Sequence, residues 1–305
     1  MQEILKRIFT YGPALIVLAA ILWGIDGILR RSLFTLPPIT IVFFEHLIGA
    51  LILAPFFFRV WKHEKLAKKE WGAIILVSIL SGVLGTLWFT TALQKVNFIP
   101  FSVVFLLQKL QPIFTIGVAA LVLKETVNRR YIGWAALAIF SAYFVTFPGG
   151  AVNLATGSGT IIAALFAVGA AIAWGSSTAF SRFVLISHSH TFVTGMRFFI
   201  TLPFALLLLF LLGQSASLSA PTGAQLGTLL IIALSTGMVA LWIYYRGLKF
   251  TQAKIATILE LAFPLTGVLI DVFLYHTVLA WTQYLAALML LYAGYRVSRL
   301  NSENS

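Results

Sequence analysis

Long apolar runs follow one another along the whole chain, separated by short stretches rich in Gly, Pro, Ser or charged residues. Each run is about as long as the 20 or so apolar residues that a helix needs to cross a bilayer. Lipid offers no partner to exposed backbone amides, so such runs form helices or a closed barrel, and their weak period-two alternation favours helices. The pattern predicts ten spanning helices, roughly 13–33, 38–58, 71–93, 99–123, 131–148, 158–184, 191–212, 225–247, 254–275 and 280–297.

The composition agrees with a surface that faces lipid. Of the 305 residues, 60% are hydrophobic and 10% are charged, whereas soluble domains carry about 25% charged residues. The absence of cysteine excludes disulfides and thiolate metal sites. Lys6 and Arg7 before the first run could belong to a signal peptide, but the run is long, lacks a small-residue cleavage site and contains Asp26. We expect a first membrane helix that stays.

The net charge of +12 lies mainly in the connections between the runs. With the N-terminus inside, the tails and even-numbered loops carry sixteen Lys and Arg residues, against Arg30, Arg31 and Lys95 on the other face. Positive residues accumulate on the cytoplasmic side of membrane proteins. We therefore expect a multi-pass protein of the inner (plasma) membrane with both termini cytoplasmic, and no nucleic-acid partner. The basic run 59–70 could also be a patch for anionic membrane lipid, but its role in setting the orientation explains it without such a contact.

An internal repeat has an offset of about 151 residues. The segment Ala-Ile-Leu-Trp-Gly at 20–24 matches Ala-Ile-Ala-Trp-Gly at 171–175, and His46 falls on Arg197. Each half holds five runs, an odd number, so the second half enters the membrane from the opposite side. Inverted repeats are typical of secondary transporters, whose cargo site lies near the midplane between the repeats. The predicted units are a first five-helix repeat, a second one and a short cytoplasmic tail, at 1–148, 158–299 and 300–305.

These features resemble the ten-helix drug/metabolite transporter (DMT) superfamily, specifically its EamA-type members. The residues that carry the resemblance are the two Trp-Gly pairs, the His46/Arg197 position, Pro112, Pro264 and the segment Leu-Val-Leu-Lys-Glu at 121–125. The resemblance covers essentially the whole chain and implies two EamA-like repeats around a central cavity, with transport of small metabolites, often amino-acid export. The chain departs from the family at 45–46, where Glu-His replaces an arginine, and at 276–277, where His-Thr replaces an acidic residue.

Ionisable residues inside the apolar runs are the first candidates for a cavity. Such a side chain costs several kcal/mol near the bilayer centre, so it usually faces the bundle interior beside a partner. Lys109 lies midway along the fourth run, flanked by Gln108 and Gln111, and Pro112 follows. Because proline lacks the backbone donor of a helix, this segment predicts a polar, kinked cavity wall. The alternative for Lys109 is a buried ion pair that fixes packing.

A second group of charges lies in the second, seventh and ninth runs. Glu45 and His46 point about 100° apart on a helix, so one could pair with Lys109 or Arg197 while the other titrates in the cavity. His46 could carry protons or form a structural hydrogen bond. Arg197 could bind a cargo carboxylate through its planar fork, or be the permanent partner of Glu45 or Glu260.

The remaining candidates are less specific. Asp26 could pair with Arg30 one turn later or line the cavity, and we expect Arg30 and Arg31 to extend to the outer surface. Aromatic and hydroxyl side chains could contact an organic cargo, or belong to ordinary packing and the interfacial aromatic belt. These residues are Trp23, Trp88, Trp174, Ser177, Tyr244 and Tyr245.

Reactive motifs are scarce. No Gly-rich phosphate loop, His-Glu-x-x-His motif or zinc-ligand spacing occurs, so no cofactor or metal is expected. The only local nucleophile beside a base is Ser-His-Ser-His at 187–190, which is more simply a polar loop. We predict a secondary active or facilitative transporter of an amino acid or related small metabolite, working by alternating access and directed outward. Proton coupling, exchange and uniport stay open, as do a monomer and a dimer. The alternative is an intramembrane enzyme or scaffold acting on lipid.

Overall fold

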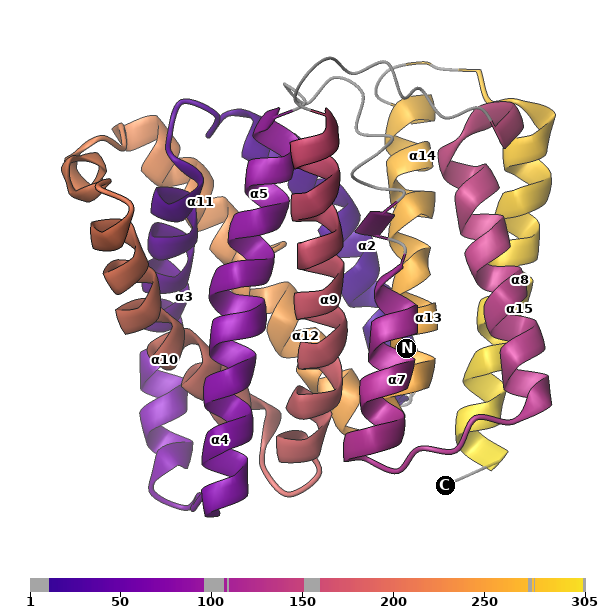
Figure 1. Cartoon of the computed structure of the whole chain (residues 1–305), viewed down its shortest axis with the longest axis horizontal. Helices are drawn as coiled ribbons and strands as arrows, with labels where there is room; N and C mark the ends of the chain where they lie inside the picture. The colour runs from indigo at the N-terminus through magenta and orange to yellow at the C-terminus, as the bar shows by residue number, and fades with distance from the viewer. Residues whose placement is uncertain are drawn as a thin grey trace, which may run out of the picture.

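The computed structural model describes residues 11–95, 107–108, 110–150, 160–273, 276 and 278–303. The described residues contain no strand, and their helices stand side by side in one bundle (Figure 1). Six stretches are long and apolar enough to cross a membrane, namely Gly12–Arg30, Pro38–Trp61, Lys68–Lys95, Ile161–Leu185, His190–Leu211 and Gly223–Lys249. The predicted all-α, multi-pass membrane fold is therefore confirmed.

The four other predicted spans also contain helix, so the structure is compatible with ten. In the first half the α-helices are α2 (Gly12–Arg31), α3 (Pro38–Trp61), α4 (Lys68–Val77), α5 (Thr86–Lys95), α7 (Gln111–Val122) and α8 (Arg129–Thr146). In the second half they are α9 (Thr160–Leu185), α10 (His190–Leu211), α11 (Gly223–Leu234), α12 (Met238–Lys249), α13 (Ala253–Leu259), α14 (Phe263–Phe273) and α15 (Trp281–Glu303). Short π or 3-10 segments are η1 (Ser78–Gly85), η2 (Pro148–Gly150), η3 (Ser215–Ser219) and η4 (Glu260–Ala262).

The first helices of the two halves run in opposite directions. Gly12, where α2 begins, lies against the end of α12: if it carried a side chain, the first carbon would be 2.7 Å from the backbone oxygen of Gly247. Arg182, near the end of α9, donates to the backbone oxygen of Leu248 at 2.6 Å. Helix α2 therefore begins where α9 ends. We call this end of the bundle, which carries Arg182 and Lys249, the basic end.

Helix packing follows the same symmetry. Helix α2 packs on α12 and α14, and α9 packs on the corresponding helices α5 and α7 of the other half. Two contacts join equivalent helices directly, α3 with α10 and α8 with α15. The two halves are therefore interleaved, because each opening helix packs on helices of the opposite half. A shared space results between them.

Several spans are interrupted rather than continuous. The span predicted over 225–247 consists of α11 and α12, separated at 235–237, and the span predicted over 254–275 consists of α13 and α14, separated by η4. Gly237 has φ −90° and ψ −102°, which is not helical. In the fourth span, helix α7 begins at Gln111 and has Pro112 in its first turn. Interrupted helices are tolerated at membrane depth only where the backbone is buried in protein or lines a cavity.

Candidate functional site

A cavity of about 540 Å³ lies between the two halves, beside the interruptions. Sites for small organic molecules usually enclose about 300–1,000 Å³. Twelve of the candidates named from the sequence line this cavity: Trp23, Asp26, Glu45, His46, Gln108, Gln111, Trp174, Ser177, Arg197, Tyr244, Tyr245 and Glu260. They come from both halves, so the cavity belongs to neither half alone.

Two candidates are not part of this wall. Lys109 lies outside the described residues. Trp88 is not among the lining residues, because its ring packs on Gly169 of α9. The contact is so close that a side-chain carbon added at Gly169 would lie 2.8 Å from the Trp88 ring. Phe89, about 100° further round α5, lines the cavity instead. The repeat could have indicated Phe89, since the segment Phe-Thr-Thr-Ala-Leu at 89–93 matches Tyr-Tyr-Arg-Gly-Leu at 244–248, four residues beyond the main offset.

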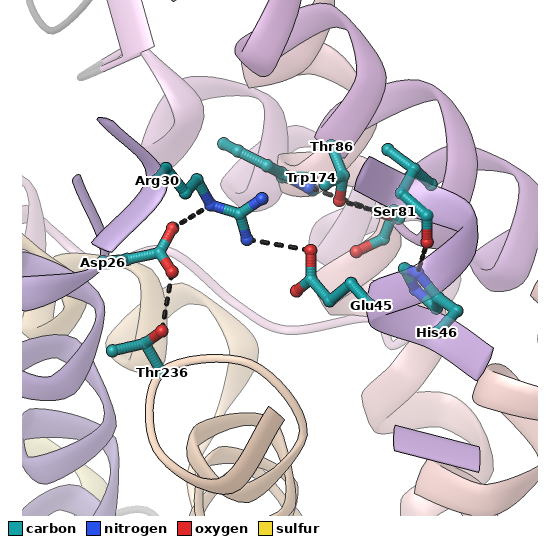
Figure 2. A network of polar contacts seen from close by, with 9 residues as sticks. Asp26, Arg30, Glu45, His46, Ser81, Thr86, Trp174 and Thr236 are labelled. Carbon is teal, nitrogen blue, oxygen red and sulfur yellow. Dashed lines mark hydrogen bonds and ion pairs between the residues drawn. The ribbon is translucent and has the colours of Figure 1, made fainter. Parts of the chain in front are cut away.

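Arg30 lies between two carboxylates at the edge of the cavity, as Figure 2 shows. Its Nε donates to Asp26 one turn earlier on α2, and its Nη2 donates to Glu45 Oε2 on α3 at 2.9 Å. Thr236, at the interruption between α11 and α12, donates to the other Asp26 oxygen at 2.6 Å. This charge cluster therefore joins three spans from both halves.

The charge cluster corrects two expectations. Arg30 is only 6% exposed, so the prediction that it extends to the outer surface is wrong. The two carboxylates neutralise its charge and make burial tolerable. Glu45 is bonded to Arg30 rather than to Arg197. The predicted local pair of Asp26 with Arg30 is present. The side chain of Arg31 is not described.

Arg197 of α10 occupies a different part of the wall. Its Nη1 donates to the Tyr245 hydroxyl at 3.2 Å, and its Nε has no hydrogen-bond partner among the described residues. No described carboxylate forms an ion pair with it, so pairing with Glu45 or Glu260 is not observed. Because Arg197 is 8% exposed and lines the cavity, it keeps unused donor capacity beside the enclosed space.

His46 forms the structural hydrogen bond that was one of its two expected roles. Its Nδ1 donates to the backbone oxygen of Val42, one turn earlier on α3, at 2.8 Å. The imidazole ring also packs on Phe198, with 4.9 Å between ring centroids. One face of His46 is thus fixed by its own helix and by α10, while the residue still lines the cavity.

Glu260 lies at the interruption of the ninth span. Its two carboxylate oxygens accept hydrogen bonds from Tyr244 Oη at 2.5 Å and from Gln111 Nε2 at 2.8 Å. Gln111 is the first residue of α7, so the fourth span and the interrupted ninth span meet at this carboxylate. The polar wall predicted around Gln108 and Gln111 therefore includes Glu260.

Two aromatic pairs face the same space. Trp23 and Tyr244 have ring centroids 5.1 Å apart, and Trp174 and Phe89 have centroids 5.2 Å apart. All four residues line the cavity. The pairs are equivalent under the repeat, because each joins the Trp-Gly motif of one half to the third span of the other. Trp174 Nε1 also donates to the backbone oxygen of Ser81 at 3.4 Å, which orients its ring (Figure 2).

The loop that contains Ser187 is not arranged like a nucleophile and its base. Both ring nitrogens of His188 contact carboxylates, with Nδ1 2.6 Å from Glu64 Oε2 and Nε2 3.1 Å from Glu70 Oε2. These contacts tie the loop before α10 to the segment before α4 and to the first turn of α4. His188 thus joins the two halves at the basic end. Among the described residues, no group of three or more His, Cys, Asp or Glu side chains could hold a metal ion.

Comparison with known proteins gives the family. The EamA-like transporter family matches residues 10–147 and again 161–298. This chain belongs to that family. It is also 36% identical over 296 residues to the riboflavin transporter ImpX of Fusobacterium nucleatum subsp. nucleatum, covering 95% of this chain and 98% of that protein. A solved crystal structure has the same fold, with a TM-score of 0.75 at 16% identity, covering 95% of this chain and 98% of that one.

Family membership and the relative identify the EamA-family chain as a transporter of a small metabolite and not an enzyme. The two matched segments begin at residues 10 and 161, the offset of the repeat seen in the sequence. The cavity between the halves is where a transporter with inverted repeats would hold its cargo.

Proposed function

We propose that this protein carries riboflavin, or a closely similar flat heterocyclic metabolite, across the inner membrane. The observation that carries the proposal is the presence of two aromatic pairs in one cavity of about 540 Å³. Aromatic side chains bind flat rings by offset or edge-to-face stacking. The proposal is supported by the relative named as a riboflavin transporter.

Polar groups around the aromatic pairs suit such a cargo. Carbonyl oxygens of a flavin ring need donors, and Arg197 Nε is a buried donor with no partner among the described residues. Ser177 and Thr178 also line the cavity and offer hydroxyls for a sugar-alcohol chain. The stacked rings and the polar donors would together orient a molecule that is flat at one end and hydroxylated at the other.

The transport cycle that we propose is alternating access between the units 1–148 and 158–299. Because α2 and α9 run in opposite directions and pack on helices of the opposite half, a rocking motion could open the shared cavity to either side. The basic end would face the cytoplasm with both termini, following the distribution of Lys and Arg. Outward transport remains an expectation of the same mechanism, which would work with proton coupling, with exchange or as a uniport.

Amino-acid export is the second candidate for the same cavity. The observation in its favour is that the wall contains both carboxylates, such as Glu260, and the unpaired Arg197. These charges could bind an ammonium and a carboxylate group. A small amino acid would leave much of the cavity and both aromatic pairs without contact, so we rank it below the flavin.

The test is transport by the purified full chain in liposomes, with riboflavin or labelled amino acids placed first outside and then inside. Loss of a stacking partner for a flat heterocycle costs about 1–3 kcal/mol, so Trp23→Ala and Trp174→Ala should each weaken apparent affinity about five- to a hundredfold. The matched control is Trp281→Ala, which removes an indole that is 75% exposed. Transport of an amino acid without transport of riboflavin would refute the flavin assignment.

A further inference from the structure

A second cavity of about 290 Å³ lies where the first turn of α8 meets the end of α15. Its lining residues are Arg130, Trp134, Arg296, Arg299 and Leu300, and none of them lines the central cavity. Helices α8 and α15 pack together and stand at one edge of the bundle (Figure 1). This cavity is therefore separate from the proposed transport site.

The arginine cavity lies at the basic end. Tyr131, next to Arg130, donates a hydrogen bond to the backbone oxygen of Lys254 at 2.6 Å. Glu125 accepts from the backbone nitrogen of Lys254 and pairs with Arg182 of α9. The start of α8 is thus fixed to the end of the molecule where α9 terminates. At this depth, a membrane protein meets the headgroups of one leaflet.

Three arginines share this cavity, and none of them has an acidic partner among the described residues. None of Arg130, Arg296 and Arg299 forms an ion pair with a described carboxylate. Arg296 is held in place by aromatic rings, with its guanidinium carbon 4.6 Å from the ring centroid of Trp134 and its Nη1 donating to Tyr292 Oη at 3.0 Å. Like charges in one small space repel one another, so an anion bound among them would be stabilised.

The neighbouring surface indicates which kind of anion fits. Apolar side chains on α8 and α15 are exposed away from the bundle, among them Ile132 at 54%, Phe140 at 57% and Leu288 at 67%. In a membrane these side chains contact acyl chains. A phospholipid lying along this face would bring its phosphate to the helix ends, where guanidinium groups can bind phosphate oxygens through their fork of donors.

We propose that this arginine cavity binds the phosphate-bearing headgroup of an anionic phospholipid. Anionic lipids are enriched in the cytoplasmic leaflet, and basic pockets between helices on that side are suited to them. Because α8 belongs to the first half and α15 to the second, the bound lipid contacts both halves. It thereby links them at the basic end, independently of any cargo in the central cavity.

The test is lipid binding to the purified full chain in mild detergent, measured by native mass spectrometry. Phosphatidylglycerol and phosphatidylcholine with identical acyl chains are titrated separately. Each arginine of this cavity that contacts the headgroup should strengthen binding of the anionic lipid by about fivefold. Replacing all three arginines by glutamine should therefore weaken phosphatidylglycerol binding on the order of a hundredfold. Phosphatidylcholine binding should not change.

The matched control removes three charges elsewhere. Lys62, Lys65 and Lys69 are exposed and do not line the cavity, so their joint replacement by glutamine should leave phosphatidylglycerol binding within about twofold. Equal weakening by the two triple variants would overturn the proposal, as would equal binding of both lipids. Displacement of the lipid by millimolar inorganic phosphate would identify a free-phosphate site instead. If the arginine triple variant does not fold, Arg299→Gln should weaken binding about fivefold and Arg299→Lys should retain it.

Discussion

Replacing Arg30 by Gln should destabilise the protein more than replacing either carboxylate bonded to it. Arg30 is 6% exposed and holds Asp26 and Glu45 together. Without it, buried Glu45 and partly buried Asp26 lose their cation, and breaking a buried ion pair from one side costs about 3–5 kcal/mol. In Glu45→Gln the arginine keeps Asp26, so one charge-assisted hydrogen bond is lost, which costs about 1.5–3 kcal/mol.

A second change separates the charge effect from simple loss of packing. The double variant Arg30→Gln/Glu45→Gln removes one of the two unpaired carboxylates, so it should be less destabilised than the sum of the single variants. Coupling between residues in one ion-pair network is about 0.5–3 kcal/mol. The free energy of unfolding is measured by titration with a denaturing detergent in mixed micelles, followed by tryptophan fluorescence.

Arg59→Gln is the control for loss of an arginine, because Arg59 is exposed and exposed substitutions usually change stability by less than about 0.5 kcal/mol. Two results would refute the reasoning. One is a cost for Glu45→Gln equal to that for Arg30→Gln, and the other is strict additivity in the double variant. Either would mean that Arg30 does not neutralise both carboxylates in the folded protein.

Two further predictions concern packing and pH. A side-chain carbon at Gly195 would lie 2.1 Å from Cδ2 of Phe57, whereas one at Gly227 would meet nothing within 4 Å. In the same unfolding assay, Gly195→Ala should therefore lower the free energy of unfolding by about 1–3 kcal/mol, and Gly227→Ala should not lower it. Equal effects of the two substitutions would contradict the observed close approach of α3 and α10. Burial lowers the pKa of His188, but the contacts with Glu64 and Glu70 outweigh burial and raise this pKa above 6.5. Burial raises the pKa of Glu64, but the hydrogen bonds from His188 and Ser189 outweigh burial and hold this pKa below 4.5. Their contact should therefore stabilise the protein fully between about pH 4.5 and 6.5, weaken as pH rises through the raised pKa of His188, and weaken as pH falls through the lowered pKa of Glu64. The advantage in melting temperature of wild type over His188→Gln should shrink between pH 6 and 9, and a constant difference would exclude this linkage.

The sequence was sufficient to predict the helical membrane fold and much of the cavity wall. A charged or amide side chain in an apolar run has to face the bundle interior, and this rule alone selects Glu45, Arg197 and Glu260. The repeat adds Trp23 and Trp174, which stand in equivalent places. These signals are local or depend on a fixed offset, so they require no knowledge of how distant helices meet.

The pair of Asp26 with Arg30 within one helix was predicted, but partners on different helices could not be, because they depend on how the helices pack. Arg30 lies near the end of its apolar run, a position from which arginine usually extends to the surface. Its burial results from the approach of α3, which brings Glu45 within 2.9 Å, and from Thr236, which fixes Asp26. Trp88 and Phe89 show the same limit, because the sequence does not give the rotational position of α5 that turns Phe89 to the cavity.

The interruptions were missed for a different reason. A membrane span is recognised from the hydrophobicity of about 20 consecutive residues. A break of the helix at a single glycine hardly changes this hydrophobicity, so it cannot be detected in this way. Pro264 was visible among the residues that carry the family resemblance, but glycine and proline also occur within continuous membrane helices. The backbone of Gly237 and the segment η4 show the interruptions, and the contacts of Thr236 with Asp26 and of Glu260 with Gln111 show that polar groups meet there.

The two halves match the same family model but carry different polar side chains at equivalent positions, and the proposed transport cycle requires both properties. If each half can adopt the conformation of the other, the inward- and outward-facing states have similar free energies, so a modest difference in cargo affinity is enough to shift the population. The aromatic pairs Trp23–Tyr244 and Trp174–Phe89 preserve this symmetry. His46 and Arg197 break it, because equivalent positions carry an imidazole bonded to its own helix and a guanidinium with an unused donor. A flat cargo could stack on either pair, but its polar end would bind on the Arg197 side in both states, so the cargo would keep one orientation while access alternates.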